Sequence, residues 1–158
     1  MKTIEGSVNG SSKRFGLVVA RFNHFVTEPL LDGAVAALKE HGVGDGDITV
    51  TRVPGTFELP PVAARLARSG RFDAIIALGA VIRGGTPHFD YVANEAAKGT
   101  AEVAMRTGLP VAFGILTCDT VEQAVERAGE GASNKGWEAA LAALEMADLN
   151  SQLGAAGL

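Results

Sequence analysis

Short apolar runs alternate along the chain with longer segments whose apolar residues recur at helical spacing. The runs are Phe15–Ala20, Ile48–Val53, Asp73–Val81 and Pro110–Thr117. Runs of this length that are rich in branched residues and bounded by turn residues are typical of β-strands. The third run is apolar almost throughout, which favours a strand that is covered on both faces.

Each run is followed by a segment in which apolar residues return every three or four positions, as on the buried face of a helix. N-cap residues and glycine stops set the expected bounds. The predicted helices are one between Thr27, as its N-cap, and Gly42; one from about Glu58 to Gly70; one from Phe89 or Tyr91 to Thr107; a short one, Val121–Ala128; and a longer one, Lys135–Leu149.

Four strand–helix units in succession predict an α/β fold. We expect an open four-stranded parallel sheet with helices on both faces, a flavodoxin-like arrangement of three layers (α/β/α), because four units are too few for a barrel. The length of 158 residues fits a single domain, residues 1–158. The segment Lys2–Val8 could add another strand. It has no evident partner in its own chain, so we expect it to pair with a neighbouring subunit.

Charge and cysteine content exclude several classes of function. Lys and Arg total 14 against 18 Asp and Glu, and the scattered basic residues form no stripe for nucleic acid. Cys118 is the only cysteine, so neither an internal disulfide nor a multi-cysteine zinc site can form. The longest apolar run, Ala74–Ile82, is too short to span a membrane, and Met1–Gly10 lacks the apolar core of a signal peptide. We predict a cytoplasmic protein with no nucleic-acid or membrane partner.

Candidate chemistry gathers in the loops that follow the predicted strands. In open α/β sheets ligands bind outside the carboxyl ends of the strands. The loops are Arg21–His24, Pro54–Glu58, Ala80–His88 and Thr117–Asp119, and the first three carry aromatic, charged or glycine-rich content. This convergence predicts a binding site at that edge of the sheet.

The loop Gly84–His88 combines glycines, a threonine and a histidine ahead of a helix. Free backbone N–H groups and the Thr86 hydroxyl make a candidate anion site, with a plain turn as the alternative. Imidazoles give and take protons near neutral pH, so His88 is a candidate acid–base residue, with a helix-capping or surface histidine as the alternative.

Four other residues each allow two interpretations. The rings of Phe22 and Phe57 could stack on a flat heterocycle or close over the core. Glu58 could complement a helix start or accept hydrogen bonds from ligand hydroxyls. Arg127 could complement a helix end or bind a phosphate. Sequence spacing does not choose between these alternatives.

Together the motifs resemble the lumazine synthase family in order and spacing over essentially the whole chain. They are Arg21-Phe22-Asn23, Pro54–Pro60, Leu78–Val92, Glu126–Gly129 and Asn134–Gly136. The resemblance implies the fold predicted above. It also implies condensation of 5-amino-6-(D-ribitylamino)uracil with 3,4-dihydroxy-2-butanone 4-phosphate, which yields 6,7-dimethyl-8-ribityllumazine, phosphate and water. No cofactor or metal is implied.

The resemblance also assigns roles to twelve residues. Those expected to hold the pyrimidine substrate and its ribityl chain are Phe22, Thr56, Phe57, Glu58, Ala80, Val81 and Ile82. Gly85, Thr86 and Arg127 are expected to bind the butanone phosphate, His88 to shuttle protons, and Phe113 to line the site from the next subunit.

Family members assemble as pentamers, decamers or icosahedral shells of twelve pentamers. The short joint Gly129–Gly136 resembles that of shell formers, and riboflavin synthase is a further expected partner.

Many members carry lysine where this chain has Gly131, which predicts weaker binding of the phosphate substrate. A lumazine- or flavin-binding protein without turnover and an archaeal-type riboflavin synthase are the competing interpretations.

Overall fold

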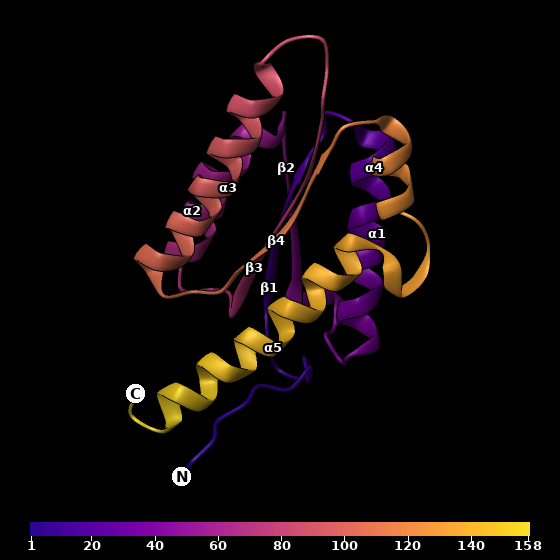
Figure 1. Ribbon diagram of the computed structural model, residues 1–158. Coiled ribbons are helices and arrows are strands. Elements are labelled where there is room, and N and C mark those ends of the chain that lie inside the picture. The colour runs from indigo at the N-terminus through magenta and orange to yellow at the C-terminus, as the bar shows by residue number, and fades with distance from the viewer.

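A four-stranded parallel sheet forms the middle layer of the computed structural model, which describes residues 1–158 (Figure 1). The strands are β1 (Phe15–Ala20), β2 (Ile48–Val53), β3 (Ala74–Ile82) and β4 (Val111–Cys118). Their order across the sheet is β2-β1-β3-β4, with every neighbouring pair parallel. The predicted open sheet is confirmed, and β2 and β4 are its edges.

Helices cover both faces of this sheet, which confirms the three-layer prediction (Figure 1). α1 (His24–Glu40), α4 (Val121–Arg127) and α5 (Lys135–Ala155) lie on one face, whereas α2 (Leu59–Arg68) and α3 (His88–Thr107) lie on the other. Three short 3₁₀ turns, η1 (Asp45–Asp47), η2 (Thr56–Glu58) and η3 (Gly131–Ser133), connect them. No helix in the chain has both the length and the apolar character needed to cross a membrane.

The central strands supply both cores because alternate side chains point to opposite faces. Leu17 and Val19 of β1 pack into the cluster under α1 and α5, and Val18 packs into the cluster under α2 and α3. All six residues of β1 are buried. At about 1.5–3 kcal/mol for each large apolar side chain removed from water, these two clusters are the main stabilising term.

The start of α1 corrects one prediction. The helix begins at His24, directly after a left-handed turn at Asn23, and Thr27 is a fully buried residue inside it rather than its N-cap. Pro29 lies within the helix. At the other end of the chain, α5 extends to Ala155, six residues beyond the predicted Leu149.

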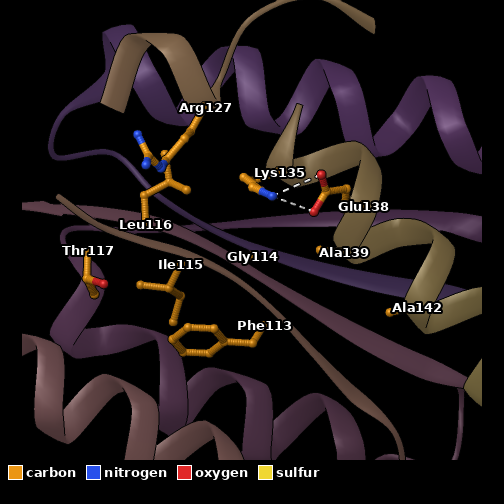
Figure 2. Close-up of a pocket in the computed structure, with 10 residues that line it drawn as sticks. All are labelled: Phe113, Gly114, Ile115, Leu116, Thr117, Arg127, Lys135, Glu138, Ala139 and Ala142. Carbon is orange, nitrogen blue, oxygen red and sulfur yellow. Dashed lines mark hydrogen bonds and ion pairs between the residues drawn. The ribbon is translucent and has the colours of Figure 1, made fainter. Parts of the chain in front are cut away.

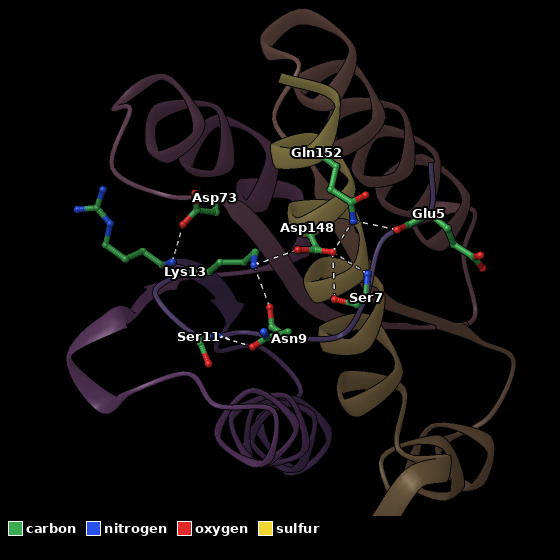
Figure 3. A network of polar contacts seen from close by, with 9 residues as sticks. Glu5, Ser7, Asn9, Ser11, Lys13, Asp73, Asp148 and Gln152 are labelled. Carbon is green, nitrogen blue, oxygen red and sulfur yellow. Dashed lines mark hydrogen bonds and ion pairs between the residues drawn. The ribbon is translucent and has the colours of Figure 1, made fainter. Parts of the chain in front are cut away.

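The N-terminal segment, residues 1–10, forms no strand within the chain and lies along α5 (Figure 3). Asp148 Oδ2 accepts hydrogen bonds from the backbone N and Oγ of Ser7, at 2.8 and 3.0 Å. Lys13 Nζ lies 3.3 Å from Asp148 Oδ1, and Gln152 Nε2 donates to both Asp148 and the Glu5 carbonyl. The bonds to the Asp148 carboxylate, from the Ser7 backbone first and then from Gln152 and the Ser7 hydroxyl, lower its pKa from 3.8 to about 2. Pairing of this segment with a neighbouring subunit stays a prediction.

Candidate active site

A cavity of about 730 Å³ opens at the carboxyl ends of β1, β2 and β3. Its volume lies within the range of small-molecule sites. The cavity lies where the sheet topology brings three strand-end loops together, as the sequence predicted. Nine of the twelve predicted site residues line it: Phe22, Thr56, Phe57, Glu58, Ala80, Val81, Ile82, Thr86 and His88.

The floor of this cavity is the end of β3. Ala80 and Val81 are buried and Ile82 is half-buried. β1 pairs with β3 only as far as Val19 opposite Leu78, whereas β3 continues to Ile82. The early departure of β1 leaves backbone of β3 without a strand partner on that side. A ligand at this edge could bond to the backbone directly.

Two aromatic rings stand at the rim of the cavity. The side chain of Phe22 is 70% exposed and that of Phe57 is 56% exposed. Neither ring is therefore a buried lid of the core. Exposure of large apolar rings beside a cavity favours a role in binding.

The turn η2 brings two further side chains to the cavity. Glu58 is half-buried, its carboxylate lies over Gly55, and it makes no hydrogen bond or ion pair within the chain. It is a free acceptor for ligand hydroxyls. Thr56 is buried, and its hydroxyl packs against Gly79 without a hydrogen-bond partner.

The loop Gly84–Pro87 leads into α3, whose first residue is His88. Gly84, Thr86 and His88 line the cavity, and Gly85 lies in the same exposed loop without lining it. His88 is exposed and makes no hydrogen bond within the chain. Its imidazole is therefore free to exchange a proton with a bound molecule.

Arg83 anchors this loop, a function that the sequence analysis missed. Its Nε lies 2.9 Å from Asp119 Oδ1, its Nη1 lies 3.5 Å from Asp90 Oδ1, and its guanidinium stacks 4.4 Å from the centre of the Phe89 ring. The hydrogen bond to Asp119, together with both negative charges, raises the pKa of Arg83. The loop is thus tied to α3 and to the end of β4.

Phe113 and Arg127 line a second hollow of about 510 Å³, at the β4 edge of the sheet (Figure 2). The two cavities share no lining residue. Phe113, Ile115 and Thr117 project to one side of β4, and Arg127 lies above the other side (Figure 2). Within one chain, the structure does not bring Phe113 and Arg127 to the first cavity.

Arg127 is the unpaired cation of the second hollow. Its Nη1 donates to the carbonyl of Gln123 at 3.1 Å, and it forms no ion pair with a carboxylate. The other cation, Lys135, is paired with Glu138 at 2.7 Å (Figure 2). Arg127 can therefore offer its guanidinium to an anion. Cys118, the last residue of β4, lies near Arg127 and is buried. Burial raises the pKa of its thiol.

A buried asparagine fixes the helices that carry Arg127 and Lys135. Asn134 Oδ1 caps α5 by accepting from the backbone N of Gly136 and Trp137, at 2.8 and 3.1 Å. Its Nδ2 lies 3.0 Å from the Pro29 carbonyl, 3.1 Å from that of Ala128 and 2.9 Å from that of Gly129. One side chain thus joins α1, the end of α4 and the start of α5.

Several lining residues were not singled out in the sequence. Besides Lys135 in the second hollow, the first cavity adds Asn23, Pro54, Gly55, Gly84, Phe89, Tyr91 and Val92. All of these lie inside the motifs already quoted. Position within a strand-end loop could have identified Asn23, Pro54, Gly55 and Gly84, whereas Phe89, Tyr91 and Val92 lie in α3 and Lys135 begins α5. The remaining residues of the second hollow, on β4 and α5, lie outside the motifs. No group of three or more histidine, cysteine, aspartate or glutamate side chains could hold a metal ion.

The comparison with protein families agrees with this geometry. The family model of 6,7-dimethyl-8-ribityllumazine synthase matches residues 12–151. The match begins just before β1, ends within α5 and includes every residue that lines the two cavities. The chain therefore belongs to the 6,7-dimethyl-8-ribityllumazine synthase family, the transferases that make lumazine in riboflavin biosynthesis.

Proposed function

We propose that the first cavity binds 5-amino-6-(D-ribitylamino)uracil and that 3,4-dihydroxy-2-butanone 4-phosphate binds beside it at the loop Gly84–His88. The observation that carries this proposal is the concentration of nine expected site residues in one cavity of a family member. The whole chain, residues 1–158, would act as one domain.

Binding of the pyrimidine would use the exposed aromatic rim and the free edge of β3. The ring of Phe22 offers a flat face to the heterocycle. Ala80, Val81 and Ile82 would contact the uracil. Backbone of β3 beyond the end of the β1 ladder would bond to its edge at Ile82, since the Ala80 carbonyl already accepts from Asn23. Glu58, a carboxylate with no partner in the chain, would accept hydrogen bonds from the ribityl hydroxyls, with Thr56 and Phe57 alongside.

The phosphate substrate requires a held anion and a mobile proton. Backbone N–H groups at Gly85 and Thr86 and the guanidinium of Arg127 would bind the phosphate. The 5-amino group attacks the ketone carbonyl, and the imine forms with loss of one water. Phosphate then leaves by elimination, and the ribitylamino nitrogen closes the ring on the remaining carbonyl with loss of a second water. His88 would carry protons between these steps, an effect of roughly 10²–10⁴-fold, and holding both substrates together would add the proximity effect.

One complete site would need two subunits. The phosphate-binding loop and Arg127 belong to cavities with no residue in common, and the second hollow lies at a sheet edge that another chain can approach. Exposed Phe113 would cover the first cavity of the neighbouring subunit. We therefore propose that an isolated subunit is inactive and that subunits associate head to tail into a closed ring.

The ring we propose is a pentamer, with twelve pentamers in an icosahedral shell and riboflavin synthase as a further partner. The short joint between α4 and α5, residues 128–134, supports the shell. Analytical sedimentation that finds only free pentamers would refute the shell. Cys118, buried and unpaired, supports a reducing compartment such as the cytoplasm.

A turnover assay tests the enzyme. The protein is mixed with both substrates and lumazine fluorescence is followed, with His88→Ala and Arg127→Ala alongside. We expect formation well above the spontaneous rate and a large loss in each variant. Lumazine binding without turnover would instead favour a storage protein, and riboflavin made from lumazine alone would favour a riboflavin synthase.

A further inference from the structure

The turn between β1 and α1 holds an asparagine in the left-handed backbone region. Asn23 has φ 60° and ψ 42°, and Ser12 is the only other non-glycine residue with positive φ. Asparagine tolerates this region better than most residues. Asn23 is the N-cap residue of α1, but its side chain accepts no N–H from that helix.

The side chain of Asn23 bonds to a distant strand instead. Its Nδ2 donates to the carbonyl of Ala80 at 3.0 Å. Ile75 of β3 bonds towards β4, so alternation places the Ala80 carbonyl on the β1 side. Because the β1–β3 ladder ends at Leu78, the Asn23 amide supplies the donor that a longer β1 would have supplied from its backbone.

The two residues before Asn23 bond on the other side of the turn, to the end of β2 and the residue that follows it. The backbone N of Phe22 donates to the carbonyl of Pro54 at 2.9 Å, and that of Arg21 donates to the carbonyl of Val53 at 2.8 Å. The turn is therefore fixed to β2 on one side and to β3 on the other. The ring of Phe22, exposed for most of its area, has little packing to orient it, so the backbone of this turn sets its direction.

We propose that Asn23 is a positioning residue for the pyrimidine substrate. It fixes the ring of Phe22 relative to the end of β3. The ring that stacks on the pyrimidine and the backbone that bonds to the pyrimidine edge therefore keep a fixed relative position. Asn23 acts through Phe22 and Ala80 and takes no part in proton transfer. The inference rests on the proposed function, in which Phe22 stacks on the heterocycle.

Two substitutions separate the amide from the backbone conformation. Asn23→Gly keeps the left-handed backbone without strain and removes the amide. Asn23→Ala removes the amide and strains the turn as well. The matched control is Ser12→Gly, which removes a side chain at the other positive-φ position, in an exposed turn that lines neither cavity.

We expect Asn23→Gly to raise the KM for the pyrimidine about tenfold, the usual effect of one lost hydrogen bond in a partly buried place. The kcat should stay within about twofold, and the KM for the butanone phosphate should not change. A merely structural role would lower the folded fraction, and with it kcat, without changing either KM. Equal pyrimidine KM values for wild type and Asn23→Gly would overturn the inference.

A binding titration separates this inference from the proposed function. The probe is 6,7-dimethyl-8-ribityllumazine, followed by its own fluorescence. Weaker binding to Asn23→Gly than to wild type supports the inference, and equal binding refutes it while the proposed function stands. If wild type does not bind the probe, the proposed function fails, and the inference with it. Should Asn23→Gly not fold, Asn23→Asp keeps the shape but sets a carboxylate against the Ala80 carbonyl, and the same change in KM is expected.

Discussion

The most demanding structural prediction concerns Asn134→Ala. Asn134 is 3% exposed and bonds two backbone N–H groups and three carbonyls. Its amide has two hydrogens, so two of the three carbonyls can be bonded at full strength at once. Four full hydrogen bonds at about 1 kcal/mol net each give about 4 kcal/mol. In the variant, water that reaches the partly buried carbonyls would replace some of these hydrogen bonds. We therefore expect Asn134→Ala to lower the free energy of unfolding by about 3 kcal/mol.

Urea unfolding at one fixed protein concentration measures this loss. Circular dichroism and the fluorescence of Trp137, the only tryptophan, follow the transition, and the midpoint shift gives the change in free energy of unfolding. Thr120→Ala is the control, because Thr120 caps α4 with one exposed hydrogen bond of 3.2 Å. Its removal should cost about 1 kcal/mol or less.

A second variant identifies which bonds matter. Asn134→Asp keeps the oxygen that caps α5 but places a carboxylate against the three carbonyls, so it should destabilise at least as strongly as Asn134→Ala. If Asn134→Asp were close to wild type, Asn134 would be a helix cap and nothing more. If Asn134→Ala cost no more than Thr120→Ala, the joining of α1, α4 and α5 by this side chain would be refuted.

Three further outcomes follow from single residues. The lowered pKa of Asp148 means that its stabilisation is complete above pH 3.8 and is lost as the pH falls through about 2. After allowance for solvent screening we expect a loss of about 1 kcal/mol, absent in Asp148→Asn, in urea midpoints measured against pH. Thr27→Val should raise the unfolding free energy by up to about 1 kcal/mol, because the buried Thr27 hydroxyl has no hydrogen-bond partner; a lower urea midpoint would contradict this. Gly131→Lys should lower the KM for the butanone phosphate but also lower the melting temperature, since φ is +81° at this position; kinetics and a thermal melt together check both, and an unchanged KM would refute the first.

The strands and the first cavity could be predicted because their causes are local. Buried strands such as β3 read as apolar runs, and neighbouring parallel strands bring their following loops to one edge. The start of α1 was missed because Pro29 and Thr27 resemble a helix start, whereas the left-handed turn at Asn23 depends on a bond to Ala80 across the sheet.

The joint between α4 and α5 was beyond local reasoning for a similar reason. The partners of Asn134 include Pro29, 105 positions away in the chain. Close contact of the two helices also excludes a side chain at Gly136, where a Cβ would overlap the carbonyl of Leu30. The resemblance already placed Phe113 in the next subunit, but the separation of Arg127 from the first cavity required the fold, in which β4 is an edge of the sheet.

The most direct test of the central claim, a site shared between subunits, is mixing of two variants. His88→Ala damages the first cavity and Arg127→Ala damages the second hollow. The two are unfolded together in urea and refolded in equal amounts, with different tags to prove that mixed assemblies form. If each site takes one half from each of two neighbours, about one quarter of the sites are intact and about a quarter of wild-type turnover returns. Mixed assemblies that stay as inactive as the separate variants would contradict the account.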